Sequence, residues 1–486
     1  MKTILFLGRT GTAHQYALMA PNMKDVNLVF VAFSQKAVDV WASFQITPDY
    51  IYSDLFKKEY DSCIVNDDIL SAIDNDIIKQ SNGRFNLNGS IQSDRGFSLL
   101  SYDECLRSSV AHYNVWKRIF SEHHVDLMIH EPCSLFFNHI GSILCKKQGG
   151  VYTYQIAALS DKYEYAYLNA NYDSYDFLEI RQNYKKYLND KSLIDRDRCV
   201  KFLNKFREDH NVFFSSLIHK KQPIFKLFWD GLKNNISHKL NGAKLDKRYQ
   251  NIDYFLSAYN RPWEKIKNLI GYKREHIKYV KDIPKGEKFL FYTFHLEPEA
   301  VVLYLGDGIY KNQTKLIENI AASLPPDFYL YVKDHPHEYA YRDAIDYKRL
   351  MKVPNVRLLD RSFPAKAIIA QSEGVVALNG TAGFEGLLMG KHVYCFGHNM
   401  YSFMSRVHYV HNIRDMRSIV YDSINQQYTD DDDLMAYVMA YLESCHPGYT
   451  KCYVGGPQLE NFDHDSNAKL LAEDAIKYVE ICQNER

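Results

Sequence analysis

The stretch from Gly374 to Lys391 constrains the fold of this chain more strongly than any other stretch. It begins with a short apolar run, 374–378, of the kind that forms a buried strand in a parallel sheet. Asn-Gly-Thr-Ala-Gly follows at 379–383, and the apolar segment 384–389 predicts a helix. A strand, a glycine turn and a helix in succession predict an α/β domain. The free backbone N–H groups at such a helix N-terminus favour an anion.

The residues of this turn offer ligands for a phosphate and a sugar. Gly380 and Gly383 let a phosphate approach the backbone closely, and Asn379 or Thr381 can cap the helix. Glu385 is predicted in the first helical turn, where its carboxylate could accept hydrogen bonds from both hydroxyls of a ribose. An ordinary strand-to-helix connection capped by Thr381 has the same local pattern, because glycine turns are common in α/β domains.

A second polar motif ends another predicted strand. Residues 328–332 are mostly apolar, and Lys333, His335 and Pro336 follow. The proline ends the strand and keeps the residue before it extended. His335 is therefore expected at the carboxyl end of a parallel strand, where open α/β sheets bind ligands. A single histidine of this kind also fits a simple turn, but polar motifs at two strand ends of one sheet favour a binding site.

Together these motifs resemble a known family. The His-Pro turn, the later Asn-Gly-Thr-Ala-Gly-Phe-Glu-Gly-Leu segment and the Gly-Lys-His-Val-Tyr after it are similar to the nucleotide-sugar half of GT-B glycosyltransferases. More narrowly, they resemble the bacterial capsule polysaccharide biosynthesis family, which includes transferases of 3-deoxy-manno-octulosonic acid (Kdo). The segment 291–300, an aromatic strand with His295 and then Pro-Glu-Ala, strengthens the resemblance. It covers 285–400 well and the first 200 residues only in outline.

Length and alternating strand and helix patterns predict the domain organisation. A chain of 486 residues is expected to form two or three domains. The fold class is α/β of the GT-B type, with two Rossmann-like doubly wound domains that face a cleft. We expect an N-terminal acceptor domain over 1–165, a helical basic insertion over 166–285 and a nucleotide-sugar-binding domain over 286–460. The resemblance implies that the final helix, 466–482, packs back on the first domain.

The composition excludes several other classes of protein. The formal net charge is zero, so no nucleic-acid partner is expected. Nine cysteines occur without a Cys-x-x-Cys pair, which favours the reduced thiols of a cytoplasmic protein over disulfides or a zinc site. The first apolar run is too short for a signal peptide, and no run of about 18 apolar residues predicts a membrane span.

Two carboxylates are expected near strand ends in the first domain. Glu131 lies at the end of the predicted strand 125–132, and Asp161 lies in the loop after the strand 151–157. A glycosyl transfer needs a group that accepts the proton of the acceptor hydroxyl, or a nucleophile. Glu131 is the preferred catalytic candidate because it lies directly on an apolar strand and precedes Pro132. Glu131 could instead be a helix-end carboxylate, and Asp161 a solvated loop residue.

The loop after the first predicted strand contains Gly8, Arg9 and Thr10. It lacks the full Gly-x-Gly-x-x-Gly, so a dinucleotide site is not expected. The GT-B resemblance implies that this loop contacts the acceptor or the donor, and Arg9 is a candidate partner for the carboxylate of an acidic sugar. A plain connection between strand and helix is the alternative.

For the second domain, the resemblance implies a metal-independent transfer without a bound cofactor, because backbone donors would stabilise charge on the leaving phosphate. The acidic run at 430–433 precedes a helix and is interpreted as a cap. Glu385 would bind the ribose, His295 is a catalytic candidate, and Glu297 or Glu299 would order the loop. The residues expected to bind the nucleotide sugar, besides Glu385, are Lys333, His335, Pro336, Asn379, Gly380, Thr381, Ala382 and Gly383.

The choice of donor depends on the few cations expected near the turn, Lys391 and Lys333. The single phosphate of CMP needs fewer cationic partners than a diphosphate, which favours a CMP-activated acidic sugar such as Kdo or a nonulosonate over a UDP-sugar. A non-hydrolysing UDP-HexNAc 2-epimerase-like enzyme and a non-enzymatic GT-B scaffold are the alternatives. The basic insertion argues against the first, and the cleft residues His335 and Glu385 argue against the second.

The stretch 219–250 carries eight lysines or arginines among aliphatic and aromatic residues. A basic helix with an apolar face suits the inner leaflet of a membrane. This would fit an oligosaccharide or lipid-linked glycan acceptor and a cytoplasmic enzyme that is peripheral to the inner membrane. A helical insertion that packs its apolar face on the sheet domain is the alternative.

Overall fold

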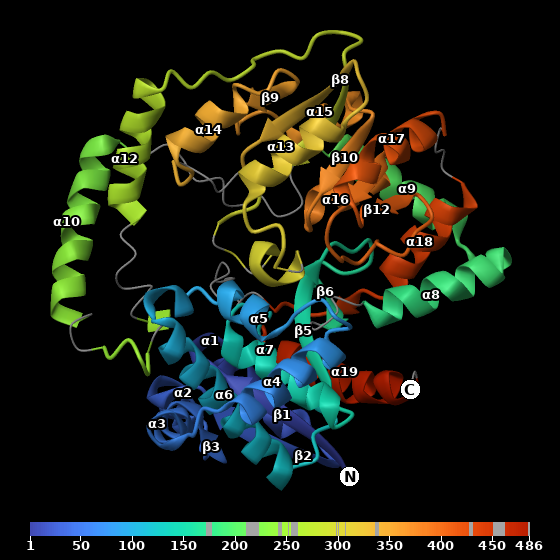
Figure 1. Cartoon of the computed structure of the whole chain (residues 1–486). Helices are drawn as coiled ribbons and strands as arrows, with labels where there is room; N and C mark the ends of the chain where they lie inside the picture. Colours follow the sequence, from blue (N-terminus) through green and yellow to red (C-terminus); the bar gives the residue numbers. More distant parts are fainter. Residues whose placement is uncertain are drawn as a thin grey trace. The chain divides into compact units, whose positions relative to one another are not determined.

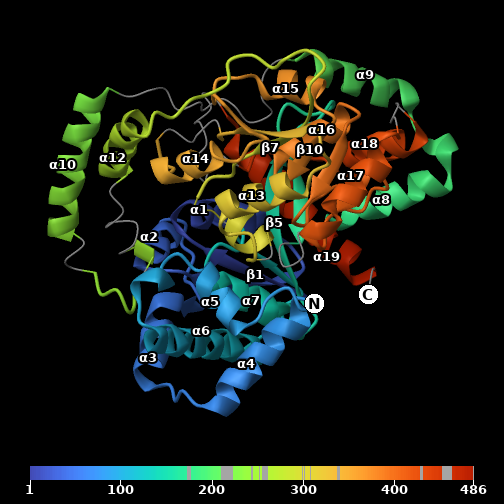
Figure 2. The same cartoon turned by 45° about the horizontal axis from the view of Figure 1, so that its top comes forward.

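The computed structural model divides the chain into two compact units, one comprising 1–190, 247–251 and 438–486 and the other 191–246 and 252–437. Each unit contains one mostly parallel sheet with helices packed against it (Figures 1 and 2). The predicted α/β class with two Rossmann-like units is therefore confirmed. The residues that the structure describes are 1–171, 177–209, 223–241, 245–250, 252–253, 261–297, 299, 301–306, 308–335, 340–426, 431–450 and 462–484.

The sheet of the first unit has the strand order β3-β2-β1-β4-β5-β6-β13. The first five of these strands are mutually parallel, and β6 pairs antiparallel with both β5 and β13. The order reverses between β1 and β4, which is where open α/β sheets bind ligands. The strands are β1 (Lys2–Gly8), β2 (Val26–Ala32), β3 (Tyr50–Ile51), β4 (Leu127–Ile129), β5 (Val151–Ala158), β6 (Ala166–Asn171) and β13 (His446–Pro447).

Helices α1, α2 and α19 share one apolar core with Ile4 and Phe6 of β1. The same core contains Trp41 of α2 and Leu471 of α19, so the C-terminal helix belongs to this unit. The helices are α1 (Thr10–Met19), α2 (Gln35–Ala42), α3 (Tyr52–Ser62), α4 (Asp67–Gln80), α5 (Leu87–Ser93), α6 (Tyr102–Glu122), α7 (Phe136–Lys147), α8 (Leu178–Asn189) and α19 (His464–Asn484), with 3-10 turns η1 (Ala20–Asn22) and η2 (Phe97–Leu99).

A half-buried ionic cluster joins the returning C-terminal segment to this unit. His446 of β13 lies 3.0 Å from Glu179 Oε1 of α8 through Nε2, and 2.8 Å from Asp474 Oδ1 of α19 through Nδ1. Burial alone would lower the pKa of His446, but the two carboxylates outweigh it and raise the pKa to about 10. The histidine is therefore charged at neutral pH.

The sheet of the second unit is parallel throughout, with the order β9-β8-β7-β10-β11-β12. If the strands of this unit are renumbered in chain order, with β7 as strand 1, the order is 3-2-1-4-5-6, which is that of nucleotide-binding Rossmann sheets. The strand order reverses between β7 and β10, which is the switch point of this sheet. The strands are β7 (Lys288–Thr293), β8 (Phe328–Lys333), β9 (Val356–Leu359), β10 (Gly374–Ala377), β11 (His392–Cys395) and β12 (Val407–Tyr409).

Strand β7 is buried on both faces. Leu290 and Tyr292 pack with α13, α14 and α17, whereas Phe289 and Phe291 pack with α15. The helices are α9 (Arg196–Glu208), α10 (Ile224–Asn241), α12 (Arg261–Arg274), α13 (Gln313–Ser323), α14 (Ala344–Leu350), α15 (Ala365–Gln371), α16 (Thr381–Leu388), α17 (Met416–Ile424) and α18 (Asp432–Glu443), with 3-10 turns η3 (Lys191–Leu193) and η6 (Ile413–Asp415) and a π-helical turn η5 (Val301–Leu305).

The units do not follow the predicted domain boundaries. Residues 166–171 were expected in a helical insertion, but they form β6, because they pair with β5 along its length. The first unit also takes 438–486, which the prediction divided between the second domain and a returning helix. The acidic run before α18 acts as a cap in its described part: Asp431 accepts a hydrogen bond from the Leu434 N–H and pairs with Arg406. Within the described ranges, no helix is both long and apolar enough to cross a bilayer.

Candidate functional site

The Gly380 turn lies at the carboxyl end of β10, beside the carboxyl end of β7. Gly380 has φ +105° and ψ −174°, a conformation essentially restricted to glycine. A β-carbon built on Gly380 would lie 3.1 Å from Cε1 of His295, which follows β7. The fold therefore brings the predicted glycine turn and the predicted histidine into contact at the switch point of the sheet.

His295 is the most unusual polar residue at this place. It is only 8% exposed, and its Nε2 has no hydrogen-bond partner among the described residues. Burial, together with the charges of His335 and Arg342, lowers the pKa of His295 to about 3. The ring is therefore neutral at physiological pH. A buried polar atom without a partner costs about 1–3 kcal/mol, which a bound ligand atom would offset.

Two residues that sequence reasoning missed hold the backbone of His295. The Gln313 side chain accepts from the His295 N–H at 2.8 Å and donates to the His295 carbonyl at 3.0 Å. Arg342 is buried, donates to the same carbonyl at 3.4 Å and pairs with Glu297 at 3.1 Å. The Arg342 guanidinium also lies 3.6 Å from the centre of the Phe294 ring. No local pattern marks Gln313 or Arg342, because each acts on a strand end distant in the sequence.

The other residues of the turn differ in part from their predicted roles. The prediction that Asn379 or Thr381 caps the helix is wrong: Gly380 is the N-cap residue and Thr381 the first helical residue, and Gly380 has no side chain with which to cap α16. Asn379 instead donates to the carbonyl of His398. Gly383 makes room for Tyr401 rather than for a ligand, because a β-carbon there would lie 2.1 Å from the Tyr401 hydroxyl.

Tyr401 is a further residue that the sequence did not reveal. Its hydroxyl donates to the carbonyl of Gly380 at 3.0 Å and so supports the turn from the side of α16. Ala382 follows Thr381 in the first turn of α16 and is half-buried. The backbone N–H groups of this first turn have no partner within the helix, as at any helix N-terminus.

Glu385 lies one residue beyond the first turn of α16 and is only 2% exposed. Burial raises the pKa of Glu385 to about 7, against the opposing charges of Lys366 and Lys333. Burial likewise lowers the pKa of Lys333 to about 8. The Lys366 ammonium also donates to the carbonyls of Phe206 and Asp209. Because Glu385 lies beyond the first turn of α16, its predicted first-turn position is wrong. Its carboxylate belongs to a buried charge cluster with Lys333 and Lys366.

Of the remaining predicted residues of the second unit, His335 lies near His295, whereas Lys391 lies at the opposite edge of the sheet. His335 is half-buried just after β8, close enough to influence the charge of His295, and Pro336 lies outside the described residues. The carbonyl of Glu299 accepts from Val302 and Leu303 at the start of η5. Lys391 was expected near the turn, but it precedes β11 and donates to the Ser372 carbonyl at 2.8 Å, at the amino edge of the sheet.

In the first unit, Arg9 and Glu131 meet at the switch point between β1 and β4. Arg9 Nη1 lies 3.0 Å from Glu131 Oε2, and the two side chains are 27% and 20% exposed. The neighbouring His130 is buried, its Nδ1 lies 2.7 Å from the Leu7 carbonyl, and burial lowers its pKa to about 4. The carboxyl edge of this sheet therefore presents an ion pair beside a neutral histidine.

The other predicted residues of the first unit are Gly8, Thr10 and Asp161. Gly8 is a packing residue, because a β-carbon there would lie 2.4 Å from the Trp41 ring. Thr10 is the first residue of α1. Asp161 is exposed in the loop after β5. Glu131 is the second residue after β4, and Asp161 is the third residue after β5.

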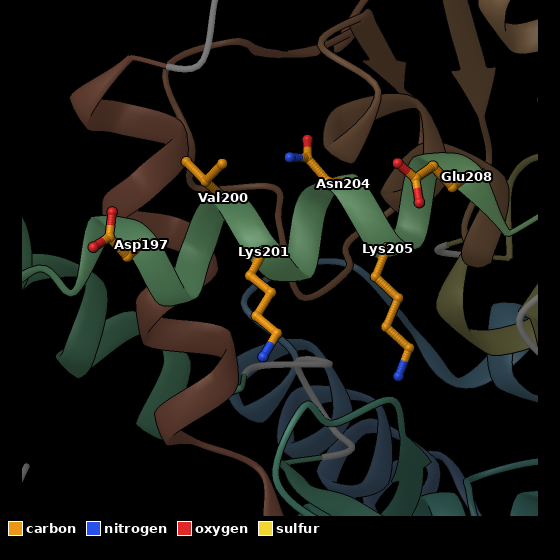
Figure 3. A pocket seen from close by; sticks show the side chains of 6 residues that line it. All are labelled: Asp197, Val200, Lys201, Asn204, Lys205 and Glu208. Atoms are coloured by element: carbon orange, nitrogen blue, oxygen red, sulfur yellow. The ribbon is translucent and has the colours of Figure 1, made fainter.

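Two surface hollows lie outside these strand ends. One, of about 490 Å³, runs along a single face of α9, where Figure 3 shows Lys201 and Lys205 projecting to the same side. The other, of about 690 Å³, lies at the amino edge of the first sheet and includes Lys2 and Asp126. Neither contains a predicted site residue. The α9 hollow is lined by Asp197, Val200, Lys201, Asn204, Lys205 and Glu208.

Residues 233–406 match the family model described as capsule polysaccharide biosynthesis protein. This segment is therefore similar to that family. It contains β7 to β11 and every described residue of the Gly380–His295 site, so the predicted resemblance is confirmed over this part of the chain. Among curated proteins, none matches the sequence.

The chain is also similar to solved structures at low scores. KpsC from Thermosulfurimonas dismutans, a β-Kdo 2,7 transferase, is 16% identical over 44% of this chain and 62% of that chain, with a TM-score of 0.26. A UDP-GlcNAc 2-epimerase from Neisseria meningitidis is 12% identical over 98% and 100%, with a TM-score of 0.26. HepE from Anabaena is 11% identical over 98% and 100%, with a TM-score of 0.25. Scores of this size carry no inference about activity.

Proposed function

We propose that this chain is a glycosyltransferase of bacterial capsule or other surface polysaccharide synthesis, which uses a nucleotide-activated sugar. The observation that supports this most directly is the buried, unpartnered Nε2 of His295 beside the Gly380 turn. That turn begins α16 at the switch point of a sheet with the 3-2-1-4-5-6 order. A neutral imidazole and a helix N-terminus together bind a phosphate without the desolvation cost of a buried cation.

In the proposed reaction, the turn binds the phosphate that leaves the sugar. Negative charge grows on this phosphate as the glycosidic bond to it breaks. The backbone N–H groups of Thr381 and Ala382 and the positive end of α16 stabilise that charge without having to reorient. His295 supplies a further donor, and Gln313 and Arg342 hold its backbone in place. In this proposal the transfer is metal-independent.

For the acceptor, we propose Glu131 as the group that takes the proton from the attacking hydroxyl. It stands at the carboxyl edge of the first sheet, and its ion pair with Arg9 fixes its orientation. Asp161 is the alternative carboxylate. The same Arg9 contact means that an acidic sugar would have to compete with Glu131 for the guanidinium.

For the donor, we propose a CMP-activated acidic sugar such as Kdo or a nonulosonate. The cations that adjoin the turn are already engaged: Lys333 and Lys366 face Glu385, and Arg342 pairs with Glu297. Lys391, the other cation that the sequence suggested for the turn, lies at the opposite edge of the sheet. A donor with one phosphate therefore fits this site better than a diphosphate.

Thermal unfolding with CMP, UDP, GDP and TDP tests the proposal. A nucleotide that binds only the native chain at 100 times its Kd adds about 2.7 kcal/mol of stability. Stabilisation by CMP, reduced in His295→Ala, would support the proposed donor. Stabilisation by UDP alone would replace it with a UDP-sugar transferase or epimerase. If no nucleotide stabilises the chain, the enzyme assignment is wrong.

A further inference from the structure

Helix α10 of the second unit carries an exposed apolar stripe. Its members recur at the spacing of one helix face, because an α-helix turns about 100° per residue. They extend from the first turn to the last of an 18-residue helix. The stripe consists of Phe225, Trp229, Leu232, Ile236 and Leu240, which are 73%, 52%, 37%, 53% and 64% exposed.

The opposite side of α10 is the side that packs. Leu227 is 1% exposed, and a β-carbon at Gly231 would lie 2.9 Å from the Trp263 ring of α12. Figures 1 and 2 show α10 alongside α12. Helix α12 is in turn anchored within the unit, because Asn268 donates to two backbone carbonyls and Tyr272 to a third. The exposed stripe is therefore not the face that holds α10 in the fold.

The charges of α10 are arranged around the stripe. At about 100° per residue, Lys226 and Lys233 flank one side of the stripe and Lys239 the other, each within about 80° of its axis. Asp230, the single carboxylate of the helix, lies about 120° away. Lysine stems can lie along apolar surface while their ammonium groups reach polar partners. This face thus combines aromatic and aliphatic side chains with a border whose charged residues are all basic.

We propose that this face of α10 docks on an anionic lipid surface, with the helix lying in the plane of the interface. An apolar stripe bordered by lysines on both sides matches a lipid layer whose acyl region is covered by negatively charged headgroups. A second copy of the same face is a poorer partner, because it would bring two sets of lysines together. The inference does not rest on the proposed enzymatic activity.

Co-sedimentation of the full chain with vesicles tests the proposal. We expect binding to phosphatidylcholine vesicles that contain phosphatidylglycerol, and much weaker binding to phosphatidylcholine alone or at high salt. Each lysine near an anionic surface contributes about fivefold to partitioning, so the triple variant K226Q/K233Q/K239Q should bind about 100-fold more weakly. A matched variant of exposed lysines in the first unit, K36Q/K58Q/K117Q, should bind normally.

Tryptophan fluorescence supplies an independent readout of which face enters the lipid. Trp41 and Trp116 are completely buried, whereas Trp229 is half exposed on the stripe. Brominated lipids should therefore quench the unmodified chain, and the quenching should largely disappear in Trp229→Phe but persist in Trp263→Phe.

Three results would overturn the proposal. The first is absence of binding to the anionic vesicles, and the second is equal binding to neutral and anionic vesicles. The third is self-association of the unmodified chain that Phe225→Ser abolishes, since the stripe would then be covered by a second copy. Thermal unfolding of each variant checks that its fold is retained.

Discussion

Replacing Gly380 by alanine tests both the strain and the proposed function of the turn. At φ +105° and ψ −174° an L residue costs about 1–3 kcal/mol. The added methyl group also meets His295 Cε1 at 3.1 Å, so the buried ring or the turn must shift by a few tenths of an ångström. We expect Gly380→Ala to lose about 2–3 kcal/mol of unfolding free energy.

The same shift should weaken nucleotide binding. The turn and the His295 ring would donate to one phosphate, and a charge-assisted hydrogen bond is worth about 1.5–3 kcal/mol. Loss of one such bond corresponds to an affinity lower by about 10- to 100-fold. Isothermal titration calorimetry with the nucleotide that stabilises the unmodified chain measures this loss, and thermal unfolding measures the stability.

Gly286→Ala is the matched control. Gly286 has φ +82° in the same unit, and a β-carbon there meets nothing within 4 Å. Alanine should therefore cost about 1–2 kcal/mol from the backbone alone and leave nucleotide affinity unchanged. Normal nucleotide affinity in a destabilised Gly380→Ala would refute the assignment of the turn as the phosphate site. An equal affinity loss in Gly286→Ala would attribute the effect to general destabilisation.

Three further predictions follow from buried charges. Arg342→Met should cost about 3–5 kcal/mol because it removes the cation 4.0 Å from the buried carboxylate of Asp334, whereas Arg349→Met, which breaks a more exposed ion pair, should cost about 1 kcal/mol or less in urea unfolding. The raised pKa of His446 stabilises the fold fully below pH 6.5, and this stability is lost as pH rises towards 10. Melting temperatures measured over a pH series should therefore lose this dependence in His446→Gln. The same pH dependence in the variant would contradict a charged His446 in the native fold. The raised pKa of Glu385 makes the fold less stable as pH rises from 4.5 to about 7. Glu385→Gln should therefore flatten the profile of melting temperature against pH over that interval. A profile as steep as that of the unmodified chain would contradict the raised pKa.

Much of the second sheet was predictable from the sequence because its signals are local. The apolar run 374–378 becomes β10, and the segment after Gly380 becomes α16. A turn that only glycine can adopt leaves a glycine in the sequence, and a strand buried on both faces leaves an unbroken apolar run. The α/β class and the family resemblance depend on such local patterns, and both are confirmed.

The tertiary structure alone decided which residues meet. Pairing of β10 with β7 brings Gly380 to His295, and the positions of α13 and of the loop before α14 bring Gln313 and Arg342 to the same strand end. The sequence suggested Lys391 for this site, but a residue that precedes a parallel strand lies at the opposite edge from one that follows a strand. Local propensity determines each element, whereas the partners of a buried polar atom depend on strand order, which short sequence patterns do not encode.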